Sequence, residues 1–380
     1  DGFVVLAAPT GEQLYTRDGS FRLDNTQTLV SATGAPLQVF AADPQGNINT
    51  GPLSNLVIPL GTTGQAIATA QVKMDGQLDP TTNVAAAGAV VISQPLVTAS
   101  GAAATDSTPL TSLVDANSLP LFATGDELTV GGSKGGINIP ASSFVVGATG
   151  TTVGDLTGHL EAVLGINTDP ATGGSPGVRI SPGPQPPAGS LIIESNQGEV
   201  NAVQLDSASI VNRNGVVTAP FTFTTSTPAS GQGVTTSFNV YDSLGNQVDV
   251  RLRAVLESKS STGVTWRFYA ESAGDRDLSA VLGTGTITFD PNGQFVGATG
   301  TDITIDRADV GSGTPLNFTL DFGGLTGLAS TDGKSDLIMD TQDGAPAGVL
   351  TNFSIATDGV VTGVYSNQKE QVLGQVALAT

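Results

Sequence analysis

His159 is the only histidine of the chain, and cysteine is absent, so few side chains are suited to catalysis or to holding a transition metal. A zinc site built around His159 would need carboxylates for nearly all its other ligands, which is uncommon. His159 also stands between Leu156 and Leu160 in a stretch with helical apolar spacing. We therefore interpret it as a surface or boundary residue of a helix and not as a ligand.

Aspartate–glycine pairs recur along the chain and could indicate calcium loops. They occur at Asp18-Gly19, Asp290-Pro291-Asn292-Gly293, Asp332-Gly333, Asp343-Gly344 and Asp358-Gly359. None has the spacing of acidic and amide residues that gives calcium enough oxygen ligands. Asp and Asn also favour turns, because they tolerate a left-handed backbone and hydrogen-bond their own backbone. The pattern predicts turns.

Lys134 lies between two glycine pairs, Gly131-Gly132 and Gly135-Gly136, which could suggest a phosphate cradle. The order of residues in a phosphate-binding loop is absent, and the context is β, so a turn is expected. Among 34 acidic residues, some pair will have the separation of a glycosidase by chance. We therefore predict no catalytic, cofactor-binding or metal-binding residues, no cofactor and no enzymatic activity.

The chain is strongly acidic, with a formal net charge of −20. Such a surface repels phosphate backbones and anionic lipids, which argues against nucleic-acid and membrane-surface roles. No apolar run approaches the ~20 residues that span a bilayer. The first residues, DGFVV at 1–5, contain no basic segment of a signal peptide, and the strand-like start suggests a piece of a longer protein.

Glycine and proline are abundant, with 49 and 21 residues, and only 13% of residues are charged. This density of turn residues predicts many short strands, hence a mainly β fold. In the first segment, Asp18-Gly19 suits a two-residue hairpin turn. Closing the hairpin there would place Leu14 opposite Leu23 and Tyr15 opposite Arg22, with Thr16 opposite Phe21. Further strands are expected near 37–41, 55–60 and 66–74.

Residues 107–217 have a different pattern, which indicates a small α+β domain. Thr152 and Asp155 have the spacing of a capping box, and Gly165 suits the exit of the helix that follows. The apolar stripe of this helix is Val153, Leu156, Leu160 and Val163/Leu164. Pro109 predicts the first position of another short helix. Strands are expected near 128–130, 137–139, 143–146 and 191–194, with a loop at 181–188.

From residue 218 onward, the period of two that is typical of strands returns. The clearest run has apolar residues at every second position, as expected for a strand with one buried face: Val248, Val250, Leu252, Ala254 and Leu256. A hairpin turn is expected at 291–293. Other strands are expected near 266–270, 286–290, 294–296, 316–322, 353–356, 360–365 and 371–378.

Three stretches resemble the sequences of a known family. The segments DGFVV at 1–5 and LYTRDGSF at 14–21 resemble the DGFF…YTRDGSF signature of flagellar axial proteins. The segment VYDSLGN at 240–246 resembles a turn of flagellar hook proteins, and 365–379 resembles their C-terminal YSNG…QVLGQIALA segment. Together and in this order, the motifs identify the chain as similar to bacterial flagellar hook proteins.

The resemblance implies a mainly β, multi-domain fold of elongated β-sandwich or β-barrel-like domains with one small inserted α+β domain. Residues 1–78 and 341–380 would form an inner, discontinuous β domain. Residues 79–106 and 218–340 would form a middle β domain, and 107–217 an outer insertion. The flanking helical segments of the family are not visible, so the resemblance implies a core fragment that is monomeric in solution.

The resemblance also implies a function. The chain would be a hook subunit that self-assembles into a curved tubular universal joint, which transmits motor torque to the filament. Its implied partners are copies of itself, the distal rod protein, the hook cap and the hook–filament junction proteins. Its implied location is the extracellular hook of the flagellum, reached without a visible signal peptide.

Two alternatives remain open from the sequence. A distal rod or hook-associated axial protein would share the first motif, and a rod polymer would be straight. From another class, a secreted adhesin or carbohydrate-binding β protein would share the composition. Such a protein should present an aromatic platform, for which one Trp and four Tyr give little material. A β-helical lyase would require a regular repeat, which we do not find.

Overall fold

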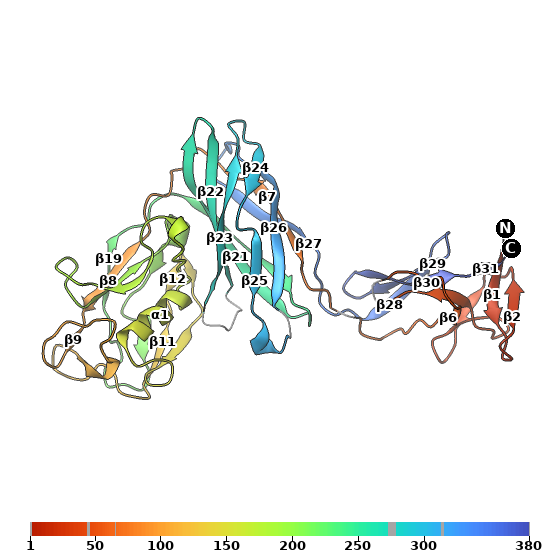
Figure 1. Ribbon diagram of the computed structural model, residues 1–380, viewed down its shortest axis with the longest axis horizontal. Coiled ribbons are helices and arrows are strands. Elements are labelled where there is room, and N and C mark those ends of the chain that lie inside the picture. Colours follow the sequence, from red (N-terminus) through yellow and green to blue (C-terminus); the bar gives the residue numbers. More distant parts are fainter. Residues whose placement is uncertain (1, 44–45, 65, 273–278, 313–314, 380) are drawn as a thin grey trace. The chain divides into compact units, whose positions relative to one another are not determined.

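The computed structural model describes residues 2–43, 46–64, 66–272, 279–312 and 315–379, and its fold is mostly β (Figure 1). The mainly β prediction is therefore confirmed. The chain forms two compact units. The first unit comprises Asp1–Ala68, Ser243–Asn246 and Gly344–Thr380, and the second comprises Thr69–Asp242 and Gln247–Asp343. Asp1, the first residue of the motif at 1–5, lies outside the described residues.

The first unit is built from both ends of the chain. The terminal strands β1 (Phe3–Ala7) and β31 (Leu378–Ala379) pair with each other, and β1 also pairs with β2 (Gln13–Thr16). A larger sheet has the order β28, β29, β30, β5, β6, with bounds Leu350–Ile355, Val360–Tyr365, Glu370–Val376, Gln38–Ala41 and Ser54–Asn55. Its core contains Leu6, Leu29, Leu37, Val39, Ile58, Leu350 and Val361.

The hairpin predicted at Asp18-Gly19 is wrong. Strand β2 pairs with β1, so that Leu14 lies opposite Leu6 and Tyr15 opposite Val5. Its predicted partner, β3 (Phe21–Leu23), pairs with β4 (Leu29–Ser31) instead.

The hairpin closes earlier in the chain, at residues 8–11, where the Gly11 N–H donates to the Ala8 carbonyl and Gly11 has a φ of 88°. The Asp18 carboxylate accepts the N–H of Ser20 and forms a local turn between strands that do not pair with each other. A cation–π contact does form, but between Arg17 and Phe3, with the guanidinium carbon 4.6 Å from the ring centroid.

The second unit contains two sheets that enclose one core. The first has the order β20 to β24, with bounds Gly233–Tyr241, Gln247–Ser260, Gly263–Ser272, Val281–Phe289 and Phe295–Ala298. The other has the order β25, β26, β7, β27, with bounds Asp302–Ile305, Leu316–Thr326, Gln71–Gln77 and Asp336–Gln342. Strands β26 and β7 pair in parallel, although they are far apart in sequence.

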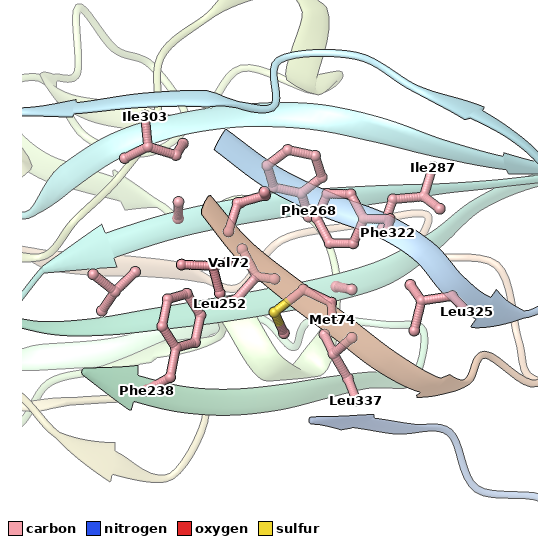
Figure 2. Packing of buried hydrophobic residues seen from close by; sticks show 14 of the residues in the cluster. Val72, Met74, Phe238, Leu252, Phe268, Ile287, Ile303, Phe322, Leu325 and Leu337 are labelled. Atoms are coloured by element: carbon pink, nitrogen blue, oxygen red, sulfur yellow. The ribbon is translucent and has the colours of Figure 1, made fainter. Parts of the chain in front are cut away.

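We call the apolar cluster between these two sheets the sheet core (Figure 2). Figure 2 shows Val72 and Met74 of β7 packed among side chains of the five-stranded sheet, such as Leu252 and Phe268. Trp266 is fully buried in the same core. The alternating apolar residues of β21 thus face this core, as their spacing predicted.

The remaining strands of the second unit surround the single α-helix of the described residues, α1 (Val153–Val163). They form small sheets with the orders β15-β16-β8-β19, β14-β11-β18, β13-β12-β17 and β10-β9. The bounds, in the same order, are Gly177–Ile180, Ser190–Glu194, Val90–Pro95, Phe223–Thr227; Ser142–Val145, Glu127–Val130, Ile210–Asn212; Ile137–Asn138, Ser133–Lys134, Val203–Gln204; and Leu113–Val114, Val97–Thr98. We call their common apolar cluster, which includes Leu128, Phe144, Leu156 and Leu160, the helix core.

The helix α1 forms as its sequence predicts. The Thr152 hydroxyl accepts the Asp155 N–H, and the Asp155 carboxylate accepts the Thr152 N–H, which completes the capping box. Gly165 leaves the helix with a φ of 61°. The other predicted helix is only a 3₁₀ turn, Leu110–Ser112, with Pro109 in the capping position and no side-chain cap, because the next residues enter β10.

Candidate functional site

His159 is buried, with 6% of its surface exposed, and so lies deeper than the surface or boundary residue expected from the sequence. Its ring meets Phe144 of β14 edge-on, with the centroids 5.3 Å apart. Burial lowers the pKa of His159, which favours the neutral ring. The Ser142 hydroxyl lies 3.5 Å from Nε2. His159 thus contributes to the helix core and has no acidic partner there among the described residues.

Lys134 is also buried, at the end of β12 and directly before the Gly135-Gly136 turn. Its ammonium lies 2.5 Å from a carboxylate oxygen of Glu271 on β22. The second oxygen of Glu271 lies 3.2 Å from Nε of Arg253 on β21. The glycines beside Lys134 shape the β12–β13 turn, and the lysine itself is held by a protein carboxylate.

Four aspartates of the Asp-rich turns, Asp18, Asp290, Asp332 and Asp358, bind their own backbone, whereas Asp343 accepts the N–H groups of Ala70 and Gln71, which are distant in sequence. In the hairpin between β23 and β24, Oδ1 of Asp290 accepts the N–H groups of Asn292 and Gln294, both at 2.8 Å. These hydrogen bonds, led by the one from Gln294, lower the pKa of Asp290. Asp358 accepts the N–H of Val360 in the same way. This is the turn chemistry that the sequence predicted.

Metal sites and membrane-spanning helices are two further possibilities for the part of the chain that the structure describes. There, no three His, Asp or Glu side chains gather in a way that could hold a metal ion. None of the helices described has the length and apolarity that crossing a bilayer requires.

The first unit exposes large apolar side chains on its terminal sheet. Tyr15 on β2 is 55% exposed and Leu378 on β31 is 62% exposed, and Phe3 and Leu14 are exposed beside them. Cross-strand partners share a face, so Leu378 lies next to Val4 and Tyr15 next to Val5. Val4 and Val5 point to opposite faces of β1, so Leu14 and Leu378 lie on one face of the sheet and Phe3 and Tyr15 on the other. Exposed apolar residues are common at protein–protein contacts, and we call these four the terminal apolar residues.

The second unit has a wide groove over the outward face of β11 and its neighbours, with a volume of about 1180 Å³. Hydroxyl and amide side chains line it, together with Glu127, Asp206 and Arg213. The Arg213 Nε donates to the Thr129 hydroxyl on the groove floor. None of the described residues that line the groove is aromatic, so it lacks the platform on which sugar rings stack.

Comparisons with known proteins define the class of the chain. The family described as the flagellar hook protein FlgE/F/G D1 domain matches residues 1–79. The family described as the flagellar basal body protein FlaE D2 domain matches residues 204–345. Together these matches cover more than half of the chain, and they place it among the flagellar hook and basal-body proteins.

Individual relatives narrow the class. The chain is 28% identical to the flagellar hook protein FlgE of Salmonella typhimurium over 214 residues, 55% of this chain and 49% of that protein. It is 32% identical to FlgE of Escherichia coli over 144 residues, 38% of this chain and 34% of that protein. The chain thus spans about half the length of the first of these relatives. It belongs to the flagellar hook protein family.

A solved structure is also similar. The crystal structure of Helicobacter pylori flagellar hook protein FlgE2 matches with a TM-score of 0.45 and 16% identity, over 99% of this chain and 86% of that one.

Sequence reasoning missed the buried group formed by Lys134, Arg253 and Glu271. The period of two in β21 assigns Arg253 to the exposed face, because its neighbours Leu252 and Ala254 face the sheet core. The structure buries both faces of this part of β21, and Arg253 is 1% exposed. The only available signal was Val255, an apolar residue on the face predicted to be polar.

Proposed function

We propose that the chain is a structural subunit of the bacterial flagellar hook, and not an enzyme. It self-assembles into a curved tube that acts as a universal joint and transmits motor torque to the filament. The observation that carries this proposal is the match of a hook D1 domain at 1–79 and a D2 domain at 204–345 in one chain. The curated relatives, which are named flagellar hook proteins, support it.

The partners and location follow from this role. The chain binds copies of itself, and at the ends of the tube the distal rod protein, the hook cap and the hook–filament junction proteins. It acts outside the cell, in the hook, without nucleic acid, membrane or cofactor. The terminal apolar residues, exposed on both faces of their sheet, support the self-contacts, since exposed apolar side chains are suited to a protein partner.

The domain limits expected from the sequence remain our proposal, with 107–217 as an outer insertion into a middle domain of 79–106 and 218–340. Two separate apolar cores within the second unit support a division into two parts, although Val91, Leu96 and Phe221, which lie outside 107–217, pack in the helix core. The inner domain of 1–78 and 341–380 is supported by the first unit, whose limits are Ala68 and Gly344. Strand β7, at Gln71–Gln77, pairs within the second unit.

A bending joint needs contacts that slide as well as contacts that hold. Large apolar contacts resemble a core cut in half and resist sliding, whereas small polar contacts with bridging water slip at modest cost. Hydroxyl, amide and charged side chains form much of the lining of the groove over β11, which therefore represents the second kind of surface. We infer that stiff β units hold their shape while polar outer faces slide.

Electron microscopy of the full-length protein after polymerisation tests the proposal. Curved tubes are the expected product. Straight tubes would instead assign the chain to the rod, and a protein that forms no tubes under conditions in which a known hook protein polymerises would contradict the proposal.

A further inference from the structure

A buried ionic group joins the two cores of the second unit. Glu271 on β22 uses one carboxylate oxygen for Lys134 of β12 and the other for Arg253 of β21. Lys134 is 2% exposed, Arg253 is 1% exposed and Glu271 is 7% exposed. Lys134 belongs to a strand beside the helix core, whereas Arg253 and Glu271 lie on strands of the sheet core. The Glu271 carboxylate thus binds one cation on the helix-core side, Lys134, and one on the sheet side, Arg253.

The remaining donors of this group bind backbone carbonyls on the side of the helix core. Nζ of Lys134 donates to the carbonyl of Gly165, directly after α1. Nη1 of Arg253 donates to the carbonyl of Val200, a residue of the 3₁₀ turn Glu199–Asn201. The sheet and the segments around α1 are therefore connected by charge-assisted hydrogen bonds, which are stronger than neutral ones.

Gly135 leaves space that the group occupies, because a Cβ there would lie 2.7 Å from Nη1 of Arg253. A Cβ at Gly165 would stand at ordinary contact distance, 3.5 Å, from Nζ of Lys134. Both glycines have positive φ, at 57° and 61°. The backbone is thus shaped around this arrangement of charges.

The apolar contact at the same junction is small. It consists of buried Ala85, Val255 and Tyr269, with Val200 packed against them. The sheet core and the helix core are separate clusters on either side. An ionic group with hydrogen bonds to both sides can fix such a junction in one arrangement, as buried polar groups do in some other folds.

The charge balance makes Glu271 the critical member. Burial acts to raise the pKa of Glu271, but Lys134 and Arg253 together hold it below its usual value, so the carboxylate stays ionised. Lys134 also experiences the positive charge of Arg251. Loss of the carboxylate would leave the buried cations without a counter-charge, which is the costly case for a buried ionic group.

We propose that Glu271 couples the sheet core and the helix core, so that the two unfold as one cooperative unit and the segments around α1 keep one orientation on the sheet. This inference goes beyond the role in the hook and holds whether or not the chain polymerises.

Three variants test it. Glu271→Gln keeps the shape of the side chain but leaves Lys134 and Arg253 unpaired. Lys134→Met removes one cation and keeps the Arg253–Glu271 pair. Glu194→Gln, which breaks the more exposed ion pair with Arg179, is the matched control.

Two probes report on the two cores separately. Trp266 is the only tryptophan and lies in the sheet core, so its fluorescence during denaturation follows that core. Hydrogen exchange of the α1 amides follows the helix core. In the wild type, both probes should give the same free energy of opening.

In Glu271→Gln, exchange of the α1 amides should accelerate by about a hundredfold or more, as expected from breaking a buried ion pair. The Trp266 transition should move much less. Lys134→Met should accelerate α1 exchange less than Glu271→Gln does, and Glu194→Gln should leave it unchanged.

Unchanged α1 exchange in Glu271→Gln would overturn the proposal, as would a shift of both probes by the same amount. Separate opening of the two cores in the wild type would overturn it as well. Should Glu271→Gln fail to fold, Lys134→Met decides the question: equal changes at α1 and at Trp266 contradict the coupling role, and a change confined to α1 supports it.

Discussion

Three residues other than glycine have positive φ, among the residues described, and each closes a tight turn. Gln27 has a φ of 61°, Ser118 of 64° and Gln368 of 63°. A left-handed backbone costs a residue with a side chain about 1–2 kcal/mol. A side-chain contact can offset this cost, and without such a contact the turn keeps the strain.

Gln368 is the strained case. It is exposed, and only its backbone N–H makes a hydrogen bond in the turn, to the Tyr365 carbonyl. We predict that Gln368→Gly raises the free energy of unfolding by about 0.5–1 kcal/mol, since relief of strain exceeds the entropy that glycine gains in the unfolded chain. Urea denaturation measures it.

Gln27 provides the control for that prediction. It has nearly the same φ, but its side-chain amide donates to the Leu60 carbonyl at 2.8 Å. Gln27→Gly should therefore stabilise less than Gln368→Gly, or destabilise. Equal stabilisation by the two substitutions would show that the hydrogen bond from Gln27 to Leu60 does not offset the backbone strain, which would contradict the prediction.

His159 predicts a pH dependence of stability. Burial lowers its pKa in the folded chain below the usual value of 6.5. Between these two pKa values the unfolded chain binds more protons than the folded one, so stability is fully present above about pH 6.5 and falls as the solution becomes more acidic. Chemical denaturation at several pH values measures this loss.

The matched variant for this dependence is His159→Gln, which cannot become charged. Its stability should change less than that of the wild type between about pH 7.5 and 5.5. The same slope in both proteins would mean that other groups cause the dependence.

At the scale of elements, local signals determined α1 and long-range pairing determined the strands. The capping box, the apolar stripe and Gly165 all act within one stretch of chain, so the helix could be predicted to within a residue or two. Strand β2 could form a hairpin with either of its sequence neighbours, β1 or β3. The Asp18-Gly19 pair alone did not indicate that β2 pairs with β1 across the turn at 8–11.

The capping box gives a prediction at this scale. Thr152→Ala should lower the stability of the helix core by about 1 kcal/mol, because an N–H at the start of α1 loses its acceptor. Thr152→Ser keeps the hydroxyl and should lose less than half as much. Hydrogen exchange of the α1 amides measures both variants, and equal losses would argue that the methyl group of Thr152 and not its hydroxyl matters.

The turn Ser243–Asn246 lies within the hook-like motif and packs in the first unit. Gly245 there has a φ of 83°, and a Cβ on it would lie 2.9 Å from Cβ of Ala66 and 3.0 Å from the Ala347 nitrogen. We predict that Gly245→Ala destabilises the first unit by the cost of its φ, about 1–2 kcal/mol, plus a further cost for this close approach.

Gly34 is the control, because it lies in the same unit and has a φ of 84° and open space where a Cβ would stand. Gly34→Ala should cost only the backbone strain. The difference between the two variants, measured by thermal unfolding, isolates the close approach of Gly245. A Gly34→Ala variant that is as unstable as Gly245→Ala would contradict the packing argument.

At the scale of the whole molecule, the sequence predicted the β class, and its motifs indicated the family. It did not predict that charged residues such as Arg253 are buried between the sheet core and the helix core. Motifs mark turns and chain ends, which are local. Arg253 is buried because segments around α1 cover the outward face of β21. The period of two within β21 does not predict that these segments cover its second face.

The central claim, that this chain is a hook subunit, is most directly tested by its location on the flagellum. The chain has no cysteine, so a single introduced cysteine can be labelled selectively in living cells. Val216 is 82% exposed and Val296 is 67% exposed, and Val216→Cys and Val296→Cys provide two independent labelling sites. With a maleimide dye on motile cells, we predict fluorescence in a short segment between the cell surface and each filament. Label along the filaments, or spread over the cell body, would contradict the assignment.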